Sequence, residues 1–283
     1  DLEDNWASGT ALEYAQAWVD SNAADYGQDS FNLTLVFNIS GGGLGWTDGD
    51  GGNGSSDCGE QQNSTSGNET NSSYFEIEEN PNPDDPGMKC FTKYVEVFGL
   101  GIYAESGLSD AQVLHAASVL AELLDNDEDG SVDDAALLNR LQNMSAIMPM
   151  FDYEGSPAYQ DFAGNYNGNG VSAVLFADEV DPTQPGHWGS DATVEEIMHT
   201  INAIGHTYVY SEAFGLEPDS SLLSDAMDEA RGGQFIEHPS SYPEEAWYHY
   251  DDTTCDYECM AIEYMYWAQV SNMGILNDTE TSD

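Results

Sequence analysis

The sequence has almost no positive charge. Only four of its 283 residues are Lys or Arg, against 53 Asp and Glu, and the formal net charge is −49. Such a chain repels the phosphates of nucleic acids and of anionic membranes and attracts cations, so we expect no nucleic-acid partner. Because salt bridges can neutralise only a few of the carboxylates, folding should benefit from bound divalent cations or from high ionic strength.

Long apolar runs are also absent. No stretch reaches the roughly 18 consecutive apolar residues that a membrane-spanning helix needs, so we expect no membrane span. The sequence starts at Asp1 without Met and shows no signal peptide, so we expect a processed, mature form. An aromatic content of 11% and the chain length argue for a folded protein with a sizeable core, and we expect one domain over residues 1–283.

Cysteine is scarce, and the four cysteines fall into two pairs along the chain. An even, small number of cysteines favours disulfides in a secreted protein. Of the three connectivities we prefer Cys58–Cys90 with Cys255–Cys259, where closing the first loop would stabilise the fold by about 3–4 kcal/mol. Thiolate metal ligation by Cys255 and Cys259 is the alternative.

Acceptor sequons for N-linked glycans are frequent. The pattern N-x-[ST] occurs at eight asparagines: Asn32, Asn38, Asn53, Asn63, Asn68, Asn71, Asn143 and Asn277. Four of them crowd into a Gly/Ser/Asn-rich insertion over residues 41–88, where glycans would be bulky and solubilising. The pattern predicts a secreted, heavily N-glycosylated protein, extracellular or at the cell surface; an Asn/Ser-rich loop without glycans is the alternative.

The hydrophobic periodicity predicts an α+β fold with more helix than sheet. We expect a mostly helical core with a small antiparallel sheet. The predicted strands cover 31–40, 75–79, 90–105 and 171–180. The predicted helices cover 11–23, 109–124 with Ser109 as N-cap, 134–144, 193–204, 222–233 with Gly232 as C-cap, and 259–274.

The acidic stretch DNDEDGSVDD, residues 125–134, lies between two predicted helices. Carboxylates at alternate positions of a curled loop point inward and suit a hard cation such as Ca²⁺. The stretch resembles the EF-hand loop in its shortened D-x-D-x-D-G form, found in extracellular calcium proteins. That resemblance implies six ligand residues: Asp125, Asp127, Asp129, Ser131, Asp133 and Asp134. Ala136 stands where an EF-hand has its bidentate Glu, so Asp134 would close the shell and the affinity should be weaker. An acidic turn without an ion is the alternative.

The stretch DATVEEIMHTINAIGH, residues 191–206, places two histidines seven residues apart in a predicted helix. Its segment EEIMH resembles the H-E-x-x-H motif of zincin metallopeptidases, with Glu195 where the first histidine would stand. The resemblance implies a zincin-like fold and a Zn²⁺ site with Glu195 and His199 as ligands, His206 or Glu263 as the third ligand, and Glu196 as general base. A packed helix that retains remnants of such a site, without metal, is the alternative.

These observations favour a calcium-binding extracellular structural protein, a coat, matrix or filament subunit without catalytic activity. Its partners would be copies of itself or other extracellular matrix proteins, joined by strand addition to a sheet edge. A secreted zinc metallopeptidase is the rival hypothesis, and a calcium buffer is a third.

Overall fold

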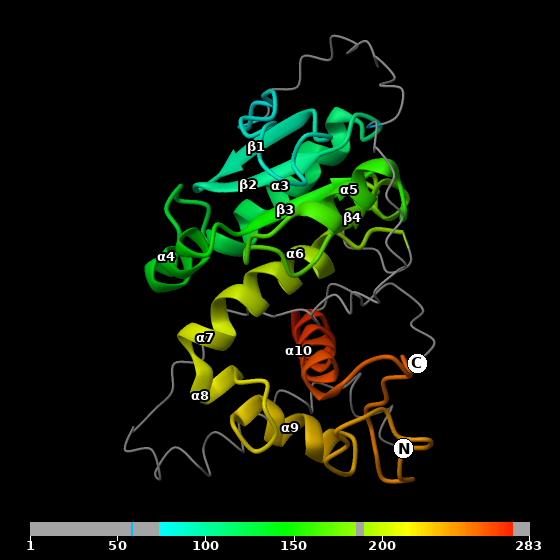
Figure 1. The fold of residues 1–283 in the computed structure, drawn as a ribbon. Helices are drawn as coiled ribbons and strands as arrows, with labels where there is room; N and C mark the ends of the chain where they lie inside the picture. Colours follow the sequence, from blue (N-terminus) through cyan, green and yellow to red (C-terminus); the bar gives the residue numbers. More distant parts are fainter. Residues whose placement is uncertain (1–57, 59–73, 185–189, 274–283) are drawn as a thin grey trace. The chain divides into compact units, whose positions relative to one another are not determined.

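The computed structural model describes residue 58, residues 74–184 and residues 190–273 (Figure 1). The chain divides into two units, Asp1–Phe37 and Asn38–Asp283, and all described residues belong to the second. The helix expected at 11–23, the strand expected at 31–40, most of the insertion and all sequons except Asn143 lie outside the described residues. Asn143 is exposed.

Within the described residues the sheet has four strands in the order β1 (Lys93–Val97), β2 (Leu100–Ala104), β3 (Ile147–Phe151) and β4 (Leu175–Phe176). Strands β1 and β2 form an antiparallel hairpin, whose two-residue turn takes positive φ at Phe98 and Gly99. Strand β3 runs parallel to both of its neighbours, β2 and β4, so the sheet is mixed. The α+β class is therefore confirmed, but the expectation of an antiparallel sheet was wrong.

The direction of the strands follows from what connects them. Helices α3 (Asp110–Leu124) and α4 (Ala135–Asn143) lie between β2 and β3, and α5 (Pro157–Asn165) lies between β3 and β4. Crossovers of this kind return the chain to the starting end of the sheet, so the next strand runs parallel. The sequence interpretation lacked both β3 and α5. The segment expected as a strand at 75–79 forms a single bridge, between Glu78 and Tyr94.

The helix ends show the expected capping chemistry. Ser109 accepts the backbone N–H of Gln112, whose side chain returns to the Ser109 backbone, and α3 starts there as predicted. Asp134 accepts two backbone N–H groups at the start of α4. Helix α9 (Leu222–Ala230) ends with Arg231 as C-cap, one residue before the expected Gly232, which follows with a positive φ of +72°. The last helix, α10, spans Tyr257–Met273.

Helix α6 (Thr193–Ile201) does not continue as a regular α-helix. A single π-helical turn, Asn202–His206, follows it, and then the short helices α7 (Thr207–Val209) and α8 (Ser211–Phe214). A π turn holds more residues than an α turn, so it changes the direction in which later side chains point. The expectation that His199 and His206 share one helix face required an unbroken α-helix, and the π turn interrupts that helix.

Helix α6 contributes side chains to two hydrophobic clusters. Ile197 and Ile201 pack into the cluster of the sheet, α3 and α4, while Met198 packs into the cluster of α9 and α10. Because these neighbouring side chains of α6 pack into both clusters, the helix is held against α3 as well as α10. Among the described helices, none is long and apolar enough to cross a membrane.

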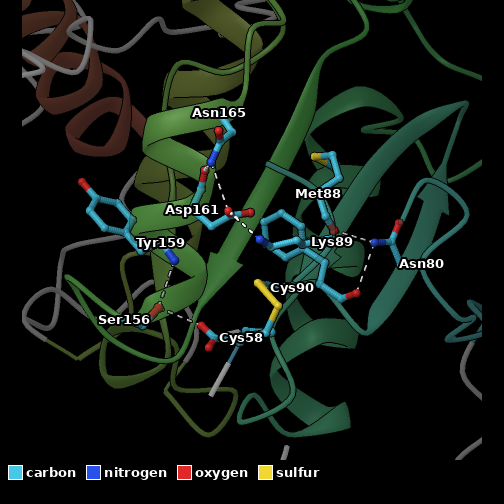
Figure 2. The surroundings of a disulfide bond; sticks show 11 residues. Cys58, Asn80, Met88, Lys89, Cys90, Ser156, Tyr159, Asp161 and Asn165 are labelled. Carbon is cyan, nitrogen blue, oxygen red and sulfur yellow. Dashed lines mark hydrogen bonds and ion pairs between the residues drawn. A yellow bond between two sulfur atoms is a disulfide. The ribbon is translucent and has the colours of Figure 1, made fainter. Parts of the chain in front are cut away.

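Both disulfides form with the preferred pairing, Cys58–Cys90 and Cys255–Cys259. Figure 2 shows the first beside Lys89, whose ammonium lies 3.0 Å from the buried carboxylate of Asp161 on α5. Asn80 donates to the backbone oxygens of Met88 and Phe91 on either side of Cys90. Cys58 is thereby attached to the folded core. Two disulfides are typical of a secreted protein.

Candidate metal centre

Two groups of His, Asp and Glu side chains within the described residues could hold a metal ion. In each group one ligand atom per residue lies within 4.8 Å of the others. The first is Glu195, His199 and Glu263, called here the buried centre. The second is Asp125, Asp127 and Asp133, called here the acidic loop.

The buried centre is assembled by two helices that are distant in sequence. Glu195 and His199 are four residues apart on α6, so they project from the same face one turn apart. Glu263 comes from α10, which packs against α6. His206 is not a member, and Glu263 takes the place of the third candidate ligand.

The two ring nitrogens of His199 have different surroundings. The side chain is buried, with the residue 4% exposed. Its Nδ1 lies 3.5 Å from a carboxylate oxygen of Glu196, and its Nε2 lies 3.8 Å from one of Glu263. Nε2 is buried and has no hydrogen-bond partner. A carboxylate beside one nitrogen of an imidazole is the arrangement that orients a metal-ligating histidine, with the other nitrogen toward the metal.

The charges of the buried centre are crowded and poorly solvated. Burial raises the pKa of Glu195 to about 7, against the lowering effect of His199. Burial also raises the pKa of Glu263. Burial by itself lowers the pKa of His199, but Glu263, Glu196 and Glu195 outweigh it and raise that pKa to about 9. Protons and a cation therefore compete for the same group of atoms.

Two tyrosines donate hydrogen bonds to the carboxylates of the centre. Tyr266 on α10 bonds to Glu195, and Tyr250 bonds to Glu263. The ring of Tyr266 also meets the ring of His199 edge-on, with centroids 5.7 Å apart. Carboxylate ligands of metal sites are usually hydrogen-bonded in this way.

An open hollow adjoins the centre. Its volume is about 340 Å³, and Glu195 and Tyr266 line it together with Asp178, Glu179 and Asp191. Burial raises the pKa of Glu179 to about 7, and one of its oxygens accepts the backbone N–H of Phe176 at 2.8 Å. The buried centre thus lies beside a space that a small molecule or a peptide side chain can occupy.

The donor set of the buried centre fits zinc. One imidazole nitrogen and two carboxylate oxygens are ligand types that Zn²⁺ accepts, and three protein ligands with an open fourth position are typical of catalytic zinc sites. The unpartnered Nε2 of His199 is the atom that such an ion would satisfy.

The acidic loop connects α3 to α4 and is mostly exposed. Asp125, the C-cap of α3, accepts the backbone N–H groups of Asp129 and Gly130, and Gly130 has the positive φ that the sharp turn requires. The backbone N–H of Asp129 lowers the pKa of Asp127. The neighbouring carboxylates of Asp129, Asp133 and Asp125 outweigh this effect, and the pKa of Asp127 is raised above its usual value. A cation would relieve this repulsion.

Among the expected carboxylate ligands of calcium, Asp125, Asp127 and Asp133 converge, whereas Asp129 is not in the group. The expected contribution of Ser131 stays a prediction. Asp134 is engaged elsewhere: one oxygen caps α4, and the other accepts the hydroxyl of Tyr210 at 2.5 Å.

His206 has surroundings unlike those of His199. It is 2% exposed, and its ring packs at a tilt against that of Tyr210 and edge-on against that of Phe214. Burial lowers its pKa to about 3, despite the nearby carboxylate of Asp134. His206 is therefore a neutral, packed histidine.

Comparison of the chain with protein-family models, curated proteins and solved structures gives no match. The buried centre has to be interpreted from its own geometry. Sequence reasoning missed three of its neighbours, Tyr266, Tyr250 and Glu179. One signal was present: Tyr266 follows Glu263 by three residues, which places both on one face of α10.

Proposed function

We propose that the protein is a zinc-dependent hydrolase with Glu195, His199 and Glu263 as metal ligands. The observation that supports this most strongly is the Nε2 atom of His199, buried without a hydrogen-bond partner at the point where two glutamates converge. Leaving such an atom unsatisfied costs about 1–3 kcal/mol, so a ligand for it is expected. The resemblance of EEIMH to the zincin motif makes peptide bonds the first substrate class to test.

Two neighbouring carboxylates would have different roles, one in orienting His199 and the other as general base. Zn²⁺, when bound, supplies Lewis acidity that polarises a carbonyl group and acidifies water. Glu196 faces Nδ1 of His199 and would orient the ring. Glu179 lines the hollow with its pKa raised to about 7, the range that suits a general base. The assignment of Glu196 as the base, made from the motif, is the alternative.

Metal analysis and peptide hydrolysis test this proposal together. The full chain, dialysed in concentrated salt, should retain about one zinc per molecule and cleave members of a peptide library. Glu179→Gln should retain zinc and lose about 100-fold or more in rate, as removal of a general base does. Asp178→Asn, in the same hollow, is the matched control and should stay within a few-fold of the original rate. Absence of bound zinc would contradict the proposal, and a loss confined to Glu196→Gln would exchange the two roles.

A second candidate function remains supported by the acidic loop. The convergence of Asp125, Asp127 and Asp133 favours a calcium ion that joins α3 to α4. Together with the two disulfides, the sequons and the acidity, it favours a calcium-stabilised, glycosylated extracellular protein, which self-association would build into a coat, matrix or filament. Such a protein would bind calcium and melt at a higher temperature with it, yet cleave no peptide.

A further inference from the structure

Tyr266 lies beside both the buried centre and the hollow. It is 4% exposed, and it belongs both to the lining of the hollow and to the surroundings of the metal ligands. Its hydroxyl bonds to Glu195, and its ring meets His199 edge-on at a centroid distance of 5.7 Å. One side chain therefore contacts two of the three ligand residues.

The helix geometry explains why one residue can do this. Tyr266 follows Glu263 by three positions on α10, so the two share a face, and that face packs against α6. Helix α10 thus brings to the centre a ligand and, one turn later, a residue that contacts the ligands from α6. Trp267 packs on the Tyr266 ring at a centroid distance of 5.3 Å and limits its movement.

We propose that Tyr266 is the positioning residue of the metal centre, which holds Glu195 to a single metal-binding oxygen and keeps one coordination position open to the hollow. The inference depends on the zinc centre proposed above. A carboxylate has two oxygens, and both can bind one ion. A hydroxyl that donates to one oxygen leaves the other for the metal, so the carboxylate binds through one atom. The ring, through its contact with His199, keeps the imidazole aimed at the same point.

The metal-binding properties of Tyr266→Phe test the proposal. This change removes the hydroxyl and keeps the ring against His199. The protein should be titrated with Zn²⁺ in competition with a chromophoric chelator, and with Co²⁺ while its visible absorption is followed. We expect the affinity to fall about 10- to 100-fold, as loss of a hydrogen bond to a metal ligand does. We also expect a weaker Co²⁺ absorption band, because a carboxylate that binds through both oxygens raises the coordination number.

Tyr264→Phe is the matched control. Tyr264 lies on the same helix and is 9% exposed, but its ring contacts Trp247 and Tyr248. Tyr264→Phe removes a hydroxyl group at a largely buried position that does not contact the ligand residues. We therefore expect a Zn²⁺ affinity within about two-fold of the original and an unchanged Co²⁺ spectrum.

A double-mutant cycle keeps the test decisive if Tyr266→Phe also lowers stability. When Tyr266 acts through Glu195, adding Tyr266→Phe to Glu195→Gln should lower the metal affinity less than it does in the original protein. Equal losses in both backgrounds, or an unchanged affinity and spectrum in Tyr266→Phe alone, would overturn the proposal. If the original protein binds neither Zn²⁺ nor Co²⁺ at one equivalent, the proposed centre itself fails, and that result is distinct from the outcomes above.

Discussion

The acidic loop and the buried centre both gather carboxylates, but the chain assembles them in different ways. The loop takes its three residues from nine consecutive positions between α3 and α4, and only Asp125 among them is buried. The centre takes its residues from α6 and α10, 68 positions apart from Glu195 to Glu263, and His199 is 4% exposed. The residues of the acidic loop are close in sequence and mostly exposed to solvent. Those of the buried centre are distant in sequence and mostly shielded from it.

This difference determines what a metal ion would do at each place. In the loop, water and backbone N–H groups already solvate the carboxylates, so an ion would add stability to an arrangement that exists without it. In the centre, burial leaves Nε2 of His199 without a partner and raises the pKa of both glutamates. There, protons or a metal ion have to compensate the charge, and an ion would bring reactivity beside the hollow.

The largest expected effect concerns His206, a buried histidine outside both groups. Its pKa in the folded protein is about 3, below the value of roughly 6.5 expected in the unfolded chain. The unfolded state therefore binds more protons in this interval, and the free energy of unfolding should fall as the pH drops from about 6.5, by up to about 5 kcal/mol. Denaturant unfolding at fixed high salt, between pH 7 and pH 5, measures the slope.

His206→Gln is the control for that slope, since glutamine stays neutral at every pH. The glutamates with raised pKa values act in the opposite direction, because the folded state binds more protons there, but they contribute equally to both proteins. The difference in slope should approach about 1.4 kcal/mol per pH unit below pH 6. Equal slopes would show that His206 is not neutral in the folded protein.

His199→Gln sharpens the contrast between the two groups. A structural zinc site binds with about 10–16 kcal/mol, so one ligand in four contributes about 3 kcal/mol, or a factor of 100 or more in affinity. We expect competition titrations to show a zinc affinity reduced by at least that factor, while the effect of calcium on the melting temperature stays the same. A zinc affinity that survives the change would place the ion elsewhere.

Asp127→Asn is the reciprocal change and has the smallest expected effect. Calcium at about 100 times its dissociation constant stabilises a folded protein by about 2.7 kcal/mol. The variant should lose most of that gain in calcium-dependent melting, and its zinc affinity should not change. Asp110→Asn, an exposed aspartate at the start of α3, removes the same charge outside the loop and should leave the calcium effect intact. If both variants respond alike, general screening of the acidic surface explains the effect of calcium.

Local features of the fold could be predicted from the sequence because neighbouring residues produce them. The N-cap at Ser109, the amphipathic pattern of α3 and the turn at Gly130 depend on contacts within a few positions, and all three are present. Strand β3, with the sequence IMPMF, was missed because it is buried on both faces and shows no alternation.

Non-local features could not be predicted in the same way. The parallel pairing of β2 with β3 depends on how α3 and α4, which connect the two strands, pack against the rest of the fold. The π turn after Ile201 interrupts the helix between His199 and His206. The sequence NAIGH contains no residue pattern that predicts such a turn.

By itself, the sequence determined the extreme negative charge, the density of sequons, the boundaries of most helices and the residue types that can hold a metal. Only the tertiary structure decided which of those residues meet. It joined Glu263 to Glu195 and His199, left His206 in an aromatic environment, and placed Tyr266 between the centre and the hollow. The physical reason is that ligand convergence depends on how α6 and α10 bury their apolar faces, and spacing along one chain segment does not contain that information.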